Sequence, residues 1–199
     1  MGNLNISQLD EALCDVRKAF RLLYSYQRRV LDLVKFIGNN LEYDYKGGNS
    51  IFSNPCPRNG KGNLDMWAWD WLNMYYYEFF FGYKPIAGHN ITFSIFIQSD
   101  TGYFDTEDNS RISVEKFALV ENSKTRLILV AGKDGWSVDK FHSGLKKLSS
   151  TDTDFYEGLP DGMIGKAYNL SEFLNEESTR SKIEDFISFC KEKNVIIKE

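Results

Sequence analysis

Carboxylates are the side chains of this sequence whose types and spacing come closest to a catalytic arrangement. Glu78 lies inside a predicted strand, and Asp100 directly follows the next predicted strand. If these strands are neighbours, the two side chains can converge, and a carboxylate pair can hold a divalent metal or transfer protons. One hypothesis is therefore a metal-dependent hydrolase or nuclease that uses Glu78 and Asp100. The structural alternative is that Glu78 pairs with a hydroxyl or an arginine and that Asp100 caps a turn.

Other kinds of catalytic chemistry have less support in the sequence. The two histidines, His89 and His142, belong to no His-x-x-x-His pair, and the cysteines form no Cys-x-x-Cys pair of the kind that binds zinc. Neither a Gly-x-Ser-x-Gly nucleophile elbow nor a Gly-x-Gly-x-x-Gly dinucleotide pattern occurs. We therefore expect no cofactor and, outside the carboxylate hypothesis, no metal site. The sequence favours a protein that is not an enzyme.

Two acidic loops indicate binding instead of catalysis. Residues 99–123 carry six acids against two bases, and residues 150–199 carry eleven against six. Acidic surfaces of this kind complement a protein partner with a basic surface. The first loop, residues 99–110, supplies the candidate binding residues Asp100, Asp105, Glu107 and Asp108, and the second, residues 149–162, supplies Asp152, Asp154 and Glu157. The simpler interpretation is that both loops are solvated turns.

The densest aromatic stretch of the chain runs from Leu64 to Tyr83. Ten of its twenty residues are aromatic, against 15% for the whole chain, so the stretch fills a core or forms a contact surface. Residues 75–82 have the composition of a strand with bulky side chains on both faces, which predicts a strand covered on both sides. The binding alternative is that three tryptophans stay exposed and contact a partner: Trp67, Trp69 and Trp71.

Length, charge and cysteine usage exclude several classes of protein. The 199 residues predict a single domain spanning 1–199, and the net charge of −4 argues against direct nucleic-acid binding. No apolar run is long enough to span a bilayer, so we expect no membrane association. The polar start of the chain resembles no secretory signal, and the odd count of three cysteines argues against a disulfide framework. These features predict a cytoplasmic protein.

The most strongly predicted element is a helix of about thirty residues that starts near Ser7 and stops at Gly38. Its apolar residues recur at every third or fourth position and form one face: Leu9, Leu13, Val16, Phe20, Leu23, Val30, Val34 and Ile37. Gln27 interrupts this face, where a polar side chain can set register against another helix or bond a buried backbone group. We therefore keep a homodimer open.

The opposite side of this helix carries a basic stripe made of Arg17, Arg21, Arg28 and Lys35. Asp10 and Asp32 share the stripe, and Arg28 with Asp32 is an i,i+4 pair. A solvated face is one interpretation. The other is a ridge that meets an acidic or phosphate-bearing partner.

The remaining segments predict an α+β fold. Strands are expected at 91–97, in a hairpin of 112–120 with 125–131, at 163–170 and at the edge in 195–197. Helices are expected after Ser137 and from Ser178 or Thr179 to about Lys193. Adjacent strands without strict alternation with helices predict an antiparallel sheet of four to six strands, packed by a long N-terminal helix and a C-terminal helix.

These patterns together predict a small cytosolic interaction protein that acts by binding another macromolecule. An inhibitor, immunity or accessory role agrees with the missing catalytic motifs, the acidic loops and the aromatic segment. The metal-dependent hydrolase or nuclease remains the alternative.

Overall fold

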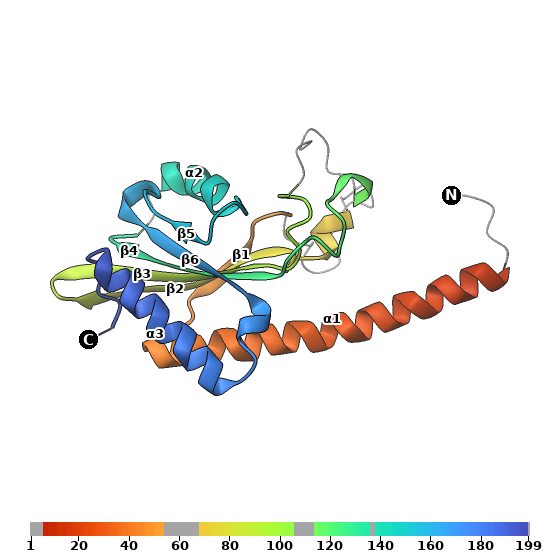
Figure 1. Cartoon of the computed structure of the whole chain (residues 1–199), viewed down its shortest axis with the longest axis horizontal. Helices are drawn as coiled ribbons and strands as arrows, with labels where there is room; N and C mark the ends of the chain where they lie inside the picture. Colours follow the sequence, from red (N-terminus) through yellow and green to blue (C-terminus); the bar gives the residue numbers. More distant parts are fainter. Residues whose placement is uncertain (1–5, 54–67, 106–113, 136–137, 199) are drawn as a thin grey trace. The chain divides into compact units, whose positions relative to one another are not determined.

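The computed structural model describes residues 6–53, 68–105, 114–135 and 138–198 of the chain (Figure 1). Its two units are residues 1–36 and residues 37–199, and each is considered on its own. Helix α1 (Ile6–Leu41) begins in the first unit and ends in the second. The single domain expected for 1–199 stays a prediction.

The long N-terminal helix is confirmed, but it ends later than the sequence predicts. α1 passes through Gly38 and reaches Leu41, and the left-handed φ of 61° at Glu42 then turns the chain. Gly38 is needed inside the helix because a Cβ there would overlap the ring of Phe81. Glycine commonly marks the end of a helix, but Gly38 lies inside α1 and allows the close packing of Phe81.

A six-stranded antiparallel sheet confirms the α+β fold class (Figure 1). Its strands follow the order β1-β2-β3-β4-β6-β5. Their bounds are β1 (Gly47–Ser50), β2 (Tyr76–Ile86), β3 (His89–Gln98), β4 (Arg126–Lys133), β5 (Phe155–Tyr156) and β6 (Ile164–Asn169).

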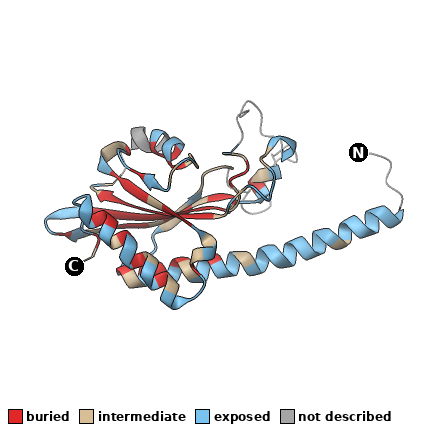
Figure 2. Ribbon diagram, in the orientation of Figure 1, coloured by how far each residue is buried: buried red, intermediate tan, exposed pale blue. Residues whose placement is uncertain are grey.

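Helices α2 (Val138–Leu148) and α3 (Glu176–Glu192) cover opposite faces of the sheet (Figure 1). Leu145 and Leu148 of α2 join the core cluster that includes Phe96 of β3. Phe186 of α3 contacts Phe93, which points to the other face of the same strand, with ring centroids 6.3 Å apart. As a result β3 and β4 are buried along almost their whole length (Figure 2).

The aromatic strand is β2, and it is paired on both sides, by β1 and by β3. Tyr76, Phe79 and Phe81 are buried, as the dense aromatic composition predicts. β2 and β3 join through Ala87 and Gly88, whose φ angles are 50° and 79°. Such angles match a tight hairpin turn.

Three other predictions differ from the structure. Residues 114–120 do not form the expected hairpin strand; they contain the 3₁₀ helix η3 (Val114–Lys116) and turns, because β4 pairs with β3 and β6 instead. α3 starts one turn early, since Asn175 accepts a hydrogen bond from the Ser178 amide and forms the N-cap. Residues 195–197 form no strand, although Val195 and Ile197 are buried.

Two further expectations concern the absence of a disulfide framework and the absence of a membrane-spanning segment. Cys14 and Cys190 are free thiols, and Cys56 lies outside the described residues. Burial raises the pKa of the Cys190 thiol. None of the helices in the described part of the chain combines the length and the apolar character that crossing a membrane requires.

Candidate functional site

The two acidic loops lie next to each other in the structure. Asp105 of the first loop accepts a hydrogen bond from the Thr101 hydroxyl on one carboxylate oxygen and from the Thr151 hydroxyl on the other. Thr151 belongs to the second loop, 46 residues further along the chain. We call the described acids of the two joined loops the acidic surface: Asp100, Asp105, Asp152, Asp154 and Glu157. Glu157 is also ion-paired with Lys193 at 2.9 Å. Glu107 and Asp108 lie outside the described residues.

The second loop is held by Arg126, the first residue of β4. Its guanidinium is buried and donates hydrogen bonds to the Ser150 carbonyl at 3.2 Å and the Thr153 carbonyl at 2.8 Å. It also donates to the Tyr156 hydroxyl at 2.7 Å and lies 3.5 Å from Asp154. A fork of fixed donors inside the loop constrains its backbone, so the exposed acids keep defined positions.

The first loop is held by its own side chains. The Asp100 carboxylate accepts the Gly102 amide at 2.8 Å, which closes a local turn as the structural alternative expects. The buried Thr101 hydroxyl accepts the Lys124 amide at 2.9 Å. The loop is therefore fastened to the segment that enters β4.

An aromatic cluster also supports the first loop from inside. Its members are Phe52, Trp69, Tyr75, Tyr103, Phe104 and Phe117. Tyr103 and Phe104 lie between Asp100 and Asp105 in the sequence, so the same loop that presents the acids inserts two rings into the cluster. The acidic surface and the aromatic cluster thus share one backbone segment.

The tryptophans predicted as binding residues differ in exposure. Trp69, in the 3₁₀ helix η2 (Ala68–Trp71), is half-buried and stacks on Phe117 with ring centroids 5.8 Å apart. Trp71 of the same turn is 62% exposed. Trp67 lies outside the described residues. Of the described pair, Trp71 is the side chain available to a partner.

Exposed apolar side chains border the aromatic cluster. Trp71 and Leu72 follow Trp69, while Val114, Leu119 and Val120 flank Phe117. Because Trp69 stacks on Phe117, the two segments that carry these side chains are held near each other. An aromatic or aliphatic anchor beside charged residues is the usual composition of a protein-binding patch.

Glu78 lines a separate pocket of about 340 Å³. Strands β1, β2 and β3 and the turn after β4 supply its other lining residues, which include Asn49 and Thr92. Its carboxylate is buried and accepts a hydrogen bond from the Ser94 hydroxyl at 2.8 Å. Burial raises the pKa of Glu78, and the hydrogen bonds from Ser94 and Asn49 oppose that rise.

Glu78 and Asp100 are not brought together. Glu78 pairs with Phe96 in the sheet, and Asp100 is four residues further on, which is about 13 Å along a strand. Within the ranges that the structure describes, no group of three or more His, Cys, Asp or Glu side chains could hold a metal ion. The carboxylate pair of the hydrolase hypothesis therefore has no common site.

The raised pKa of Glu78 gives a test of its environment. Because the folded-state pKa lies above the usual 4.5, ionisation of Glu78 destabilises the folded state at any pH above that value. Glu78→Gln removes this effect, so the melting temperature at pH 7 should rise by about 2–4 °C. The gain should disappear below pH 4.5, where the native carboxyl is protonated in both states. Thermal melts followed by circular dichroism from pH 3 to pH 8 measure this difference.

Glu42→Gln is the matched control for the pH series. The hydrogen bond from Lys198 lowers the pKa of Glu42, so its ionised form stabilises the fold. That variant should lose stability at pH 7 rather than gain it. A Glu78→Gln gain of equal size at pH 3 and pH 7 would contradict the assignment.

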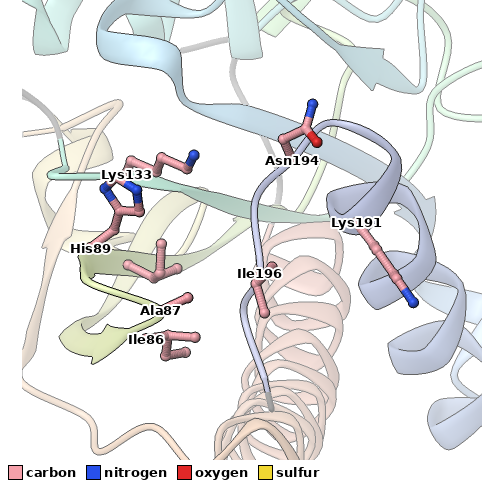
Figure 3. Close-up of a pocket in the computed structure, with 8 residues that line it drawn as sticks. Ile86, Ala87, His89, Lys133, Lys191, Asn194 and Ile196 are labelled. Carbon is pink, nitrogen blue, oxygen red and sulfur yellow. The ribbon is translucent and has the colours of Figure 1, made fainter.

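A basic pocket that the sequence does not reveal lies at the other end of β3, with a volume of about 460 Å³ (Figure 3). His89 and Lys133 lie on one wall, and Lys191 and Asn194 of the C-terminal segment lie on the other. Isoleucines 86, 91 and 196 supply apolar lining. Cations beside apolar side chains suit an anionic ligand.

A family model described as PM0109 matches residues 6–195. The chain belongs to the PM0109 family. One relative, the Pasteurella multocida (strain Pm70) protein named Uncharacterized protein PM0109, is 51% identical over 39 residues. The aligned segment covers 20% of this chain and 19% of that relative's length. No solved structure matches the chain significantly.

The residues that organise the acidic surface could not be identified from the sequence. Arg126 carries one weak signal, because it is a lone charge at the head of the continuously apolar run 127–131. Thr151 carries none, since its partner Asp105 is distant in the sequence.

Proposed function

We propose that this protein acts by binding another macromolecule, a protein with a basic surface, through the acidic surface. An inhibitor, immunity or accessory role would agree with such an activity. The observation that carries the proposal is the contact between Thr151 and Asp105, which joins two acidic loops that are separate in the sequence. Two joined loops offer a basic partner several carboxylates at once, whereas a single acidic turn offers few.

Charge and order both support this proposal. Asp105, Asp152 and Asp154 are exposed, and Arg126 lies 3.5 Å from Asp154 and offsets one of these three charges. The remaining like charges repel until a cationic partner neutralises them. Arg126 and the aromatic cluster fix the loops before a partner arrives. A fixed surface loses less conformational entropy on binding than a flexible one.

The neighbouring apolar side chains supply a second contribution. Trp71 and Leu72 are exposed beside the aromatic cluster, and a tryptophan anchor commonly contributes more to binding than several rim charges. In the proposed complex, the acids steer the partner and Trp71 contributes buried apolar area. The Glu78–Asp100 hydrolase is not proposed further, because the two carboxylates do not share a site.

Neutralising the acidic surface tests the proposal. A partner is first isolated with the tagged full chain and purified. The triple variant Asp105→Asn, Asp152→Asn, Asp154→Asn should then bind that partner roughly tenfold more weakly, mainly because association is slower. Asp154→Asn removes the ion pair with Arg126, and Asp105→Asn keeps one of the two acceptor oxygens, so the melting temperature should fall slightly and binding is compared where both proteins are fully folded. Interferometry at several salt concentrations measures the rates, and the wild-type association rate should fall as salt rises.

The control variant removes three exposed acids from α3 instead: Glu176→Gln, Glu177→Gln and Glu184→Gln. It changes the net charge by the same amount and should leave binding almost unaffected. The proposal fails if the partner binds the loop variant as tightly as the wild type and shows no salt dependence.

A further inference from the structure

The apolar residues of α1 keep a strict spacing along the whole helix. Alternating steps of three and four residues connect Ile6, Leu9, Leu13, Val16, Phe20, Leu23, Gln27, Val30, Val34, Ile37 and Leu41. Gln27 is the single polar member of this series. A repeat of seven residues with two apolar positions is the pattern of a helix that packs along a second helix.

The two halves of this apolar seam differ in burial. Val30, Val34, Ile37 and Leu41 are buried, whereas the members from Ile6 to Leu23 are exposed (Figure 2). Leu13 is 44% exposed and Phe20 69% exposed. A helix whose apolar face contacts only water is marginally stable, because helices in proteins depend on the packing of that face. An apolar stripe of this length marks an interaction surface.

Charges along the same segment are separated by sign. From residue 6 to 16 the charged residues are all acids, namely Asp10, Glu11 and Asp15. From residue 17 to 29 they are all bases, namely Arg17, Lys18, Arg21, Arg28 and Arg29. Two such helices attract each other when they run in opposite directions and repel each other when they run in the same direction.

We propose that a second copy of this chain packs antiparallel against residues 6–23 of α1. A twofold axis between residues 14 and 15 aligns the seam with itself, so that every apolar side chain meets another. The resulting layers pair Leu13 with Val16, Leu9 with Phe20, and Ile6 with Leu23, each occurring twice. This association does not depend on the acidic surface.

The residues beside the seam fit the antiparallel arrangement. Asp10 of one copy faces Arg17 of the other on one side, and the twofold axis repeats this pair. On the other side Ala12 faces Ala19, and these small side chains let the helices approach closely. In a parallel pair Arg17 would face Ala12 instead, and no charge pair would form across the seam.

The first measurement is the oligomeric state of the full chain by sedimentation. The wild type should be a dimer, and Leu13→Asp should raise the dissociation constant by on the order of a hundredfold, because it places a charge in an apolar layer twice. The tryptophan fluorescence spectrum should be unchanged, since all four tryptophans lie in residues 37–199 and are distant in sequence from the substitution. A wild type that stays monomeric up to its solubility limit overturns the proposal.

The second measurement is a charge-reversal cycle that reports the direction of the helices. Asp10→Arg and Arg17→Asp should each weaken the dimer about tenfold, because each single change places like charges together twice. The double variant should restore the wild-type constant. Lys18→Asp is the matched control, because Lys18 lies on the outer side of α1 and should change the constant little. A dimer that is insensitive to the single reversals, or that the double variant fails to restore, overturns the antiparallel second copy as the occupant.

Discussion

Replacing Phe81 with alanine should lower the free energy of unfolding by about 3–5 kcal/mol, the range for removing a buried phenylalanine ring. Phe81 is 3% exposed, and its ring centroid lies 5.5 Å from that of Phe93 and 5.9 Å from that of Tyr45. It also fills the space that Gly38 leaves open. Truncation therefore leaves a cavity between β2 and the last turn of α1. Urea denaturation followed by tryptophan fluorescence measures the loss.

Tyr83→Ala is the matched control on the same strand. Tyr83 is 66% exposed, so its truncation should change the free energy of unfolding by less than about 1 kcal/mol. Equal effects at positions 81 and 83 would show that β2 is not the packed aromatic strand described above.

The second large effect is expected at Arg126. Arg126→Met keeps an unbranched apolar stem but removes the guanidinium, and should cost about 2–3 kcal/mol. The Thr153 carbonyl and the Tyr156 hydroxyl each lose the hydrogen bond that they accept from it, and Asp154 loses its ion pair. Because Asp154 is exposed, no buried charge is left behind, which keeps the loss below that of a broken buried ion pair.

The Arg126 variant also separates folding from loop order. Hydrogen exchange at residues 149–157 should become faster even under conditions where the sheet remains folded. Lys147→Met is the control, because Lys147 is exposed and donates a single hydrogen bond to the Gly158 carbonyl. If both variants exchange alike, Arg126 does not hold the loop.

Local sequence patterns predicted the elements whose pattern is long or regular. The spacing of apolar residues over α1 and the alternation of Ile91, Phe93, Ile95 and Ile97 identified a helix and a strand correctly, because side chains on one face recur at the period of a helix or a strand. The α+β class followed from the order of these elements. The aromatic density of 75–81 correctly indicated a strand covered on both faces.

Features set by distant contacts could not be predicted in this way. Residues 112–120 have strand composition, but β3 already pairs with β2 and β4, and Phe117 is instead bound in the aromatic cluster. Whether Glu78 and Asp100 converge could not be decided from the sequence, because strand register cannot be read from a single sequence. The contact of Thr151 with Asp105 depends on the fold of the whole sheet.

The outer strands of the sheet have a consequence for aggregation. β1 has four residues, two of them glycine, and β5 has two. Beyond the end of β1, residues 81–86 of β2 form the outer edge, and Pro85 there lacks the amide that an added strand would need. A foreign strand can extend a sheet only through a row of free main-chain groups, and edges this short offer few of them. The sheet should therefore resist fibril-like growth, and association with other molecules should depend on side chains rather than on β-augmentation.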